Sequence, residues 1–152
     1  MEDLSLHILD IAENSIAAAA KRIEIKINED KDKDLLTIEI IDDGKGMDRK
    51  MVTKALDPFF TTRTTRKVGL GLPLLAQAAR ESGGKIELSS EPRGGTTVKA
   101  TFCLSHPDCK PMGDINETIR TLVASHPEID FIYEHQKDNS IYRLDTRETG
   151  RK

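Results

Sequence analysis

The spacing of apolar residues near the start of the chain predicts an amphipathic helix. An apolar stripe recurs close to the 3.6-residue period of an α-helix, and alanines continue it toward Ala20. The stripe consists of Leu4, Ile8, Ile11, Ala12 and Ala19. The polar residues Asp10, Glu13 and Asn14 interrupt this otherwise apolar segment. A packed helix that carries such side chains needs partners for them.

Two pairs of strands follow from alternating or continuous apolar runs. Residues 22–28 (RIEIKIN) and 35–41 (LLTIEII) are rich in β-branched side chains and flank a charged turn, so they predict a hairpin. Residues 85–90 (KIELSS) and 96–104 (TTVKATFCL) are joined by EPRGG, which has the composition of a turn. Between the two pairs, a second helix is expected from GLGL (residues 69–72) to the glycines that follow ARES.

The last third of the chain has a different character. Residues 105–113 (SHPDCKPMG) concentrate prolines and polar residues, as a linker does. Beyond them, Asp114 and Glu117 resemble a capping pair for a helix, and the runs IDFIYEH and IYRLD predict a hairpin. We therefore expect a main domain of residues 1–104, a linker, and a small αββ extension of residues 114–152 that either extends the sheet or docks a protein.

Composition narrows the class of protein. The chain has 152 residues, 37% hydrophobic and 32% charged, which is enough for one compact core. A net charge of -3 and an aromatic content of 4% offer no basic or stacking surface, so no nucleic-acid partner is expected. No apolar run approaches the roughly 20 residues of a membrane helix, and no signal peptide is evident. With Cys103 and Cys109 as its two cysteines, the sequence favours a cytoplasmic protein without membrane insertion.

Asp10 and Asn14 form the first candidate site. They are four residues apart, so a helix places them one turn from each other on one face. Burying such groups without partners costs on the order of a few kcal/mol each, and an Mg²⁺ ion with its waters would satisfy them. An ordinary solvated face would also explain the pair. Glu13, about 100° from Asn14 around the helix, is expected to be a solvated neighbour.

Three further segments carry candidate ligand contacts. DDGKGM (residues 42–47) ends a strand with carboxylates and then glycines, and Asp42 could accept a hydrogen bond from an exocyclic amine such as that of adenine. GLGL opens a helix whose free N–H groups can hold phosphate oxygens, although neither a P-loop nor a Rossmann fingerprint is present. GGTT (residues 94–97) begins a strand with hydroxyls that could reach a base or a water. Taken alone, each segment is also explained as an ordinary turn, helix start or strand.

As an ordered set, these motifs resemble the GHKL superfamily of gyrase-type, chaperone, histidine-kinase and mismatch-repair ATPases. LDIAENS, DDGKGM, DPFFTTR, GLGLPLLAQAARESGGKIELSS and GGTTVKATF are similar to its N, G1, F and G2 boxes and closing strand, over roughly residues 4–104. The resemblance implies a Bergerat fold. This fold is an α/β (α+β) two-layer sandwich with a mixed, mostly antiparallel sheet, helices on one face, and ATP held between a helix, the sheet and a lid.

The resemblance also implies roles for individual residues. Asn14 would bind Mg²⁺, and Asp42 would take the adenine amine, with Thr96 assisting through water. The other implied contacts belong to the adenine pocket, the lid and the phosphate loop, and they are Gly44, Gly46, Phe59, Phe60, Arg63, Gly69, Leu70, Gly71 and Leu72. The lid, residues 61–67, is similar to the short lid of nitrogen-regulator-type histidine kinases.

The chain departs from the histidine-kinase pattern at three kinds of position. Ala17 stands where a basic residue is usual, and Lys67 and Val68 stand where glycine and threonine are expected. Asp10 stands where histidine kinases commonly have an amide and where GHKL hydrolases and serine-kinase anti-sigma factors have an acid. Because water or a serine hydroxyl benefits from a base and a neutral imidazole needs none, Asp10 favours hydrolysis or phosphorylation of oxygen.

We therefore expect a Mg-dependent ATP-binding regulatory protein that acts as a protein kinase in trans or as a slow ATPase. A complete sensor kinase is not expected, because only a few residues precede the first helix, and His7 is interpreted as a packing or surface histidine. The alternatives are a non-catalytic nucleotide-dependent switch that binds a partner protein and an anti-sigma-factor-like serine kinase. A protein partner is expected, and a homodimer stays open.

Cys103, His106 and Cys109 form the pattern C-x-x-H-x-x-C, which invites a metal hypothesis with His126 or His135 as the fourth ligand. Cys103 also continues an alternating strand after Phe102, where a small buried thiol is ordinary. We favour this structural interpretation.

Overall fold

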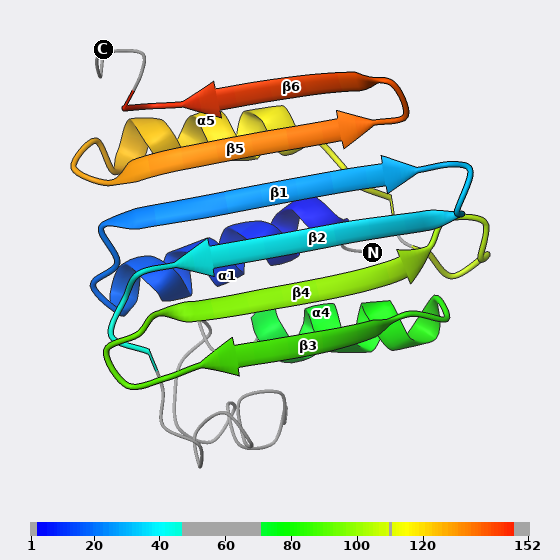
Figure 1. The fold of residues 1–152 in the computed structure, drawn as a ribbon, viewed down its shortest axis with the longest axis horizontal. Coiled ribbons are helices and arrows are strands. Elements are labelled where there is room, and N and C mark those ends of the chain that lie inside the picture. The colour runs from blue at the N-terminus through cyan, green and yellow to red at the C-terminus, as the bar shows by residue number, and fades with distance from the viewer. Residues whose placement is uncertain (1–2, 47–70, 110, 148–152) are drawn as a thin grey trace.

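A computed structural model of the chain describes residues 3–46, 71–109 and 111–147. Within these ranges, six strands form one sheet, and the three helices lie on one of its faces (Figure 1). In chain order the elements are α1 (Leu4–Ala17), β1 (Arg22–Asp30), β2 (Leu35–Asp42), α4 (Gly71–Glu81), β3 (Lys85–Ser90), β4 (Thr96–Cys103), α5 (Ile115–Ser125), β5 (Asp130–Lys137) and β6 (Ser140–Asp145). The predicted two-layer α/β fold is confirmed.

The sheet is mixed and mostly antiparallel. Its strand order is β3-β4-β2-β1-β5-β6, and each neighbouring pair is antiparallel except β1 and β5. The parallel pairing is reached through a long connection that includes α5, as parallel neighbours require. The predicted αββ segment thus supplies α5, β5 and β6 to the same sheet, with Phe131 opposite Ile23 across the β1–β5 pair.

Alternation along the strands sorts their side chains onto two faces. The face under the helices is apolar, and its buried strand residues are Ile23, Ile25, Ile27, Leu36, Ile38, Ile40, Val98, Ala100, Phe102, Phe131 and Tyr133. α1 lies at the centre of the helical layer and packs against both α4 and α5 (Figure 1). Three elements that are far apart in the sequence therefore cover one continuous core.

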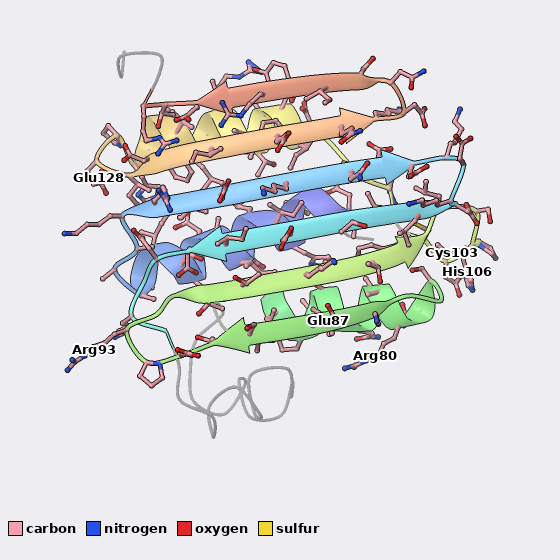
Figure 2. All side chains as sticks on the ribbon, viewed as in Figure 1. Arg80, Glu87, Arg93, Cys103, His106 and Glu128 are labelled. Atoms are coloured by element: carbon pink, nitrogen blue, oxygen red, sulfur yellow. The ribbon has the colours of Figure 1, made fainter. Side chains whose placement is uncertain are left out.

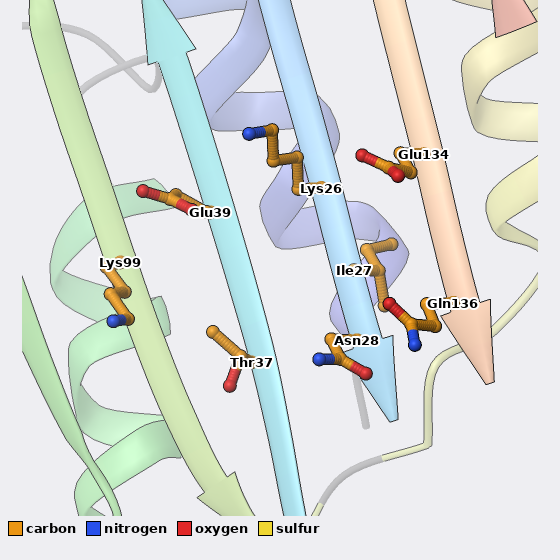
Figure 3. Close-up of a pocket in the computed structure, with 8 residues that line it drawn as sticks. All are labelled: Lys26, Ile27, Asn28, Thr37, Glu39, Lys99, Glu134 and Gln136. Carbon is orange, nitrogen blue, oxygen red and sulfur yellow. The ribbon is translucent and has the colours of Figure 1, made fainter. Parts of the chain in front are cut away.

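The opposite face of the sheet is polar, and a row of charged side chains crosses it with one residue from each strand. From β3 to β6 the row reads Glu87, Lys99, Glu39, Lys26, Glu134 and Arg143. Four of these residues help to line a shallow hollow of about 310 Å³ on this face (Figure 3). Because opposite charges are neighbours at each step, the face is polar without an excess of either sign.

The first helix ends three residues earlier than the alanine run predicts. The N–H of Ala20 donates to Ser15 O at 3.1 Å and that of Ala19 to Ile16 O at 3.0 Å, which is the bonding pattern of a Schellman motif. Ala19 has a φ of 67°, in the left-handed region where glycine is usual. Since an alanine occupies this position, no glycine marks the end of the helix in the sequence.

The C-terminal end of α4 and the N-terminal end of α5 lie at the residues that the sequence predicts. Gly83, with a φ of 85°, and Gly84, whose N–H donates to Ala79 O at 2.8 Å, terminate α4. At the start of α5, the Asp114 side chain accepts a hydrogen bond from the Glu117 N–H at 3.0 Å. None of the helices in the described ranges has the length and apolarity needed to cross a bilayer.

Candidate functional site

The candidate nucleotide-binding residues gather at one end of the sheet. β2 ends at Asp42 and β4, its antiparallel neighbour, begins opposite it at Thr96. The end of α1 is tied to the same place, because the Lys45 N–H donates to Ala18 O at 2.9 Å. α4 finishes beside the far end of β4, where the Cys103 N–H donates to Ser82 O at 3.3 Å, so α4 starts on the Thr96 side (Figure 1).

Asp42 is held by one hydrogen bond to each carboxylate oxygen. The Ser15 hydroxyl on α1 donates to Oδ2 at 2.6 Å, and the Gly44 N–H donates to Oδ1 at 2.8 Å. Ser15 is buried and Asp42 half-buried, so the carboxylate is fixed without being enclosed. A carboxylate can accept about four hydrogen bonds, which leaves it able to accept from a ligand amine.

Thr96 belongs to a row of oxygen-bearing side chains across three neighbouring strands. Asp42 on β2 is opposite Thr96 on β4, and Thr96 is opposite Ser90 on β3. The Ser90 hydroxyl lies 2.9 Å from Thr96 Oγ1 and donates to Gly95 O at 2.8 Å. The structure therefore brings together Asp42 and Thr96, the two residues predicted to share the base of a nucleotide.

Glycines let the loop after β2 approach the turn between β3 and β4. Gly46 has a φ of 72° and Gly95 a φ of 80°, and an added Cβ would overlap Glu91 O at Gly46 and Asp42 O at Gly95. A Cβ at Gly44 would lie 2.8 Å from Ala18 O. Backbone segments therefore lie in close contact at this end of the sheet, and any side chain larger than hydrogen at these glycines would disrupt the contact.

Asp10 and Asn14 are half-buried residues of α1 and lie one helical turn apart. The carboxylate of the neighbouring Glu13 lies 3.7 Å from His126 Nε2 at the end of α5. Around the helix axis, Asn14 is rotated by about 100° from Glu13. The Glu13 side chain is 42% exposed, as expected of a solvated neighbour, and it also approaches the C-terminal cap of α5.

The second carboxylate of the DDGKGM motif has a structural role. Asp43 Oδ1 accepts hydrogen bonds from the Lys21 N–H at 2.8 Å and the Arg22 N–H at 2.9 Å. Partial burial works to raise the pKa of Asp43, but the backbone donors of Arg22 and Lys21 outweigh it and hold the pKa below its ordinary value. Asp43 thus anchors the start of β1, and Asp42 alone of the two is turned to α1.

The remaining predicted contacts divide into two groups. Gly71 opens α4, and the Leu72 side chain packs in the core, so a ligand could meet Leu72 through its backbone. Five predicted residues lie outside the described ranges, and they are Phe59, Phe60, Arg63, Gly69 and Leu70.

Sequence analysis missed two residues of the site, Ser15 and Ser90. Ser15 directly follows the predicted metal ligand Asn14, but its contact with Asp42 spans 27 residues and no spacing rule reveals it.

The cysteines lie at the opposite end of the sheet, as Figure 2 shows for Cys103 and His106 relative to Arg93. The Cys103 thiol donates to Asp34 Oδ2 at 3.0 Å, and His106 Nδ1 accepts from the Asp108 N–H at 3.0 Å. Within the described part of the chain, no three His, Cys, Asp or Glu side chains come together as a metal site. The C-x-x-H-x-x-C pattern is thus used in hydrogen bonds of the turn after β4.

Comparison with known proteins identifies the family. The sequence model of the family described as "Histidine kinase-, DNA gyrase B-, and HSP90-like ATPase" matches residues 2–106. The chain therefore belongs to this family, and the predicted GHKL resemblance is confirmed. The match ends within the turn after β4, so α5, β5 and β6 lie beyond it.

The curated relatives include a nitrogen regulation protein and a sensor protein kinase. Nitrogen regulation protein NtrY of Azorhizobium caulinodans is 36% identical over 77 residues, which are 50% of this chain and 10% of that protein. Sensor protein kinase FleS of Pseudomonas aeruginosa is 34% identical over 110 residues, 72% of this chain and 27% of that protein. The chain thus spans between a tenth and about a quarter of the length of these two relatives.

Solved structures show the same fold. The ATPase domain of Aquifex aeolicus MutL, in complex with ADP, has a TM-score of 0.55 at 16% identity, and the match covers 95% of this chain and 62% of that one. At this identity the likeness establishes the fold alone.

Proposed function

We propose that this chain binds Mg-ATP at the end of the sheet where α1, β2, β4 and α4 meet. The observation that carries the proposal is the fixed Asp42 carboxylate opposite Thr96, next to a floor of close-packed glycines. A flat base fits against backbone that lacks side chains, and a carboxylate with spare acceptor capacity selects its exocyclic amine. The ADP-bound MutL domain with the same fold supports this ligand class.

The described residues fit the triphosphate and the metal as well. Asn14 would supply an amide oxygen to Mg²⁺ from α1. The turn of α4 that begins at Gly71 would supply backbone N–H groups to the phosphate oxygens. When bound, Mg²⁺ supplies positive charge that neutralises the phosphates and orients them for transfer.

Asp10 is the proposed general base. It lies one turn before Asn14 on the same flank of α1, so a hydroxyl held beside the bound metal is within its reach. A carboxylate there would take the proton from an attacking water or protein hydroxyl as that oxygen bonds to the γ-phosphorus, while the bond from this phosphorus to the bridging oxygen breaks and ADP leaves. We therefore propose a regulatory protein that phosphorylates a partner protein in trans or hydrolyses ATP slowly. The sensor-kinase relatives support the regulatory setting.

Release of labelled phosphate from Mg-ATP tests the role of Asp10. The Asp10→Asn variant is expected to bind ATP normally but to release phosphate at least about 100-fold more slowly, since a positioned base contributes about 10²–10⁴ in rate. Glu13→Gln is the matched control, because it removes a carboxylate of the same helix that faces α5. It should leave the rate unchanged.

Three other outcomes discriminate among the functions. Tight ATP binding without release by the wild type would support a non-catalytic switch in place of an enzyme. Labelling of a serine or threonine in an added partner protein would identify the kinase activity. Equal rates in the wild type and in Asp10→Asn, with both binding ATP, would exclude Asp10 as the base.

A further inference from the structure

The β6 strand forms an apolar edge of the sheet. Ile141 and Tyr142 are 60% and 55% exposed, more than any other large apolar side chain in the described ranges. They point to opposite faces, because Tyr142 pairs with His135 on the helix-covered face and Ile141 with Gln136 on the polar face. β6 is the last strand in the sheet order, so its outer backbone groups form a template for another strand.

The opposite edge, β3, carries more exposed charge than β6, whose described residues include the exposed Arg143 beside Ile141 and Tyr142. β3 exposes Lys85 and Glu87, which form an ion pair of 3.4 Å on the surface of the strand. Charged side chains on an edge strand discourage pairing with another chain. The two exposed apolar side chains, Ile141 and Tyr142, therefore distinguish the β6 edge as a surface for contact.

A groove runs beside β6 on the helix-covered face. It has a volume of about 300 Å³ and is lined by Ile119, Arg120 and Val123 of α5 and by Tyr133, Tyr142 and Leu144 of the hairpin. Its walls are mainly apolar, with the exposed Arg120 on the helix side. A strand that pairs with β6 would direct alternate side chains toward this groove.

We propose that the occupant is a second copy of this chain, whose β6 strand pairs antiparallel with β6 across a two-fold axis. The self-pairing would join two six-stranded sheets into one and would direct the second copy's Tyr142 toward the groove. An aromatic ring of this size suits the groove, and Arg120 is placed to contact its face. β1 and β5 lie between β2 and β6, so the surface is independent of the nucleotide site.

The register follows from charge and from the faces of the strand. A two-fold axis perpendicular to the sheet pairs one residue with its own copy. Centring the pairing on Tyr142 places Ile141 opposite Arg143 and Ser140 opposite Leu144, with no like charges directly opposed. Centring it on Arg143 would oppose two guanidinium groups, and centring it on Ile141 would shift Leu144 out of the paired region. Pairing centred on Tyr142 therefore avoids opposed like charges on both faces of the strand and keeps Leu144 within the paired region.

The short length of β6 sets the expected affinity. Six residues a side, with the groove, form an interface near the lower end of the size range for specific dimers. We therefore expect a dissociation constant on the order of 10 μM and a dimer that depends on protein concentration. Sedimentation equilibrium of the full chain measures it.

A charge-swap experiment tests the register. Because Tyr142 meets its own copy, Tyr142→Lys and Tyr142→Glu should each oppose like charges and be monomeric by sedimentation, with circular dichroism confirming the fold. Mixing the two variants should restore association, since lysine then faces glutamate. Ser89→Lys, on the β3 edge, is the matched control and should dimerise like the wild type. Dimers of either Tyr142 variant alone would contradict the proposal.

Hydrogen exchange provides a measurement on the wild type that needs no substitution. Amides of residues 140–144 should exchange more slowly at high protein concentration than at low concentration, whereas amides of β3 should exchange alike. A chain that stays monomeric at about 300 μM, well above the expected dissociation constant, with β6 exchange independent of concentration, would overturn the proposal. This outcome would leave the ATP site untouched.

Discussion

The part of the chain that matches the family and the αββ part beyond it use polar side chains in opposite ways. In the family part, Asp42, Thr96 and Ser90 form a row at one end of the sheet, and the Asp42 carboxylate keeps acceptor capacity for a ligand. In the αββ part, polar groups bond to one another or to the neighbouring β1. His135 lies 3.0 Å from the Tyr133 hydroxyl and 2.6 Å from Glu29.

The difference indicates which region is built around a ligand. Asp145 in β6 is buried and fully engaged, with Arg147 donating to Oδ1 from Nε at 2.9 Å and to Oδ2 at 2.7 Å. Burial raises the pKa of Tyr133 to about 12, so its hydroxyl is a neutral hydrogen-bonding group. The αββ part therefore completes the sheet and presents an apolar edge, whereas the family part presents a polar recess.

The largest expected effect is on the free energy of unfolding. It tests whether the part that matches the family and the αββ part unfold as one unit. Phe131→Ala in β5 and Phe102→Ala in β4 each empty a fully buried phenylalanine site, which costs about 3–5 kcal/mol. Because both side chains pack in one core, both variants should unfold in a single transition at a lower urea concentration than the wild type. The structure predicts no selective loss of the αββ part.

The tyrosines make this measurement region-specific. Both tyrosines of the chain, Tyr133 and Tyr142, lie in β5 and β6, and the chain has no tryptophan. Tyrosine fluorescence therefore follows the αββ part, while far-ultraviolet circular dichroism follows the whole sheet. If Phe131→Ala separates the two signals into two transitions, the parts are independent and the view of one continuous core is wrong.

A smaller effect is expected from the engaged carboxylate of the αββ part. Hydrogen bonds and charge from Arg147 lower the pKa of Asp145 to about 2. A carboxyl whose pKa is lower in the folded state stabilises the fold above its unfolded pKa of about 3.9. This stabilisation is lost as the pH falls from about 4 through 2. The wild type should therefore be more stable than Asp145→Asn at neutral pH.

Urea unfolding of both proteins as a function of pH measures this contribution. The difference in unfolding free energy between the wild type and Asp145→Asn should shrink as the pH is lowered from 5 toward 2, and it should be constant between pH 5 and 7. A difference that stays the same throughout would show that the Asp145–Arg147 pair does not lower the pKa of Asp145.

Local sequence patterns predicted where the helices and strands lie, whereas contacts between distant residues determined how the strands pair. Strand alternation and the Asp114 cap depend on neighbours a few residues away, so the strands and α5 appear where the sequence predicts them. The end of α1 was missed because alanine fills the left-handed position. The choice between sheet extension and separate docking element for the αββ part depended on pairing between β1 and β5, which no local pattern encodes.

In the candidate site too, residues in local motifs were predicted and contacts between distant residues were not. Asp42 and Thr96 were predicted from ordered motifs, and the structure places them opposite each other. Ser15 was not predicted, because its contact with Asp42 joins a helix to a strand end. The approach of Glu13 to His126 was not predicted either, because the two residues are over a hundred positions apart. The resemblance to a family supplied the roles that geometry alone could not assign.

Calorimetric titration with Mg-ATP tests the central claim, that Asp42 marks a nucleotide site. The wild type and Asp43→Asn should bind alike, because the amide side chain of this variant would keep an oxygen to accept from the Lys21 and Arg22 N–H groups. Asp42→Asn should bind about 10- to 100-fold more weakly, since it replaces a charged acceptor worth about 1.5–3 kcal/mol by an amide that presents N–H groups to an amine. Equal affinity of Asp42→Asn and the wild type, or no binding by either, would contradict the account.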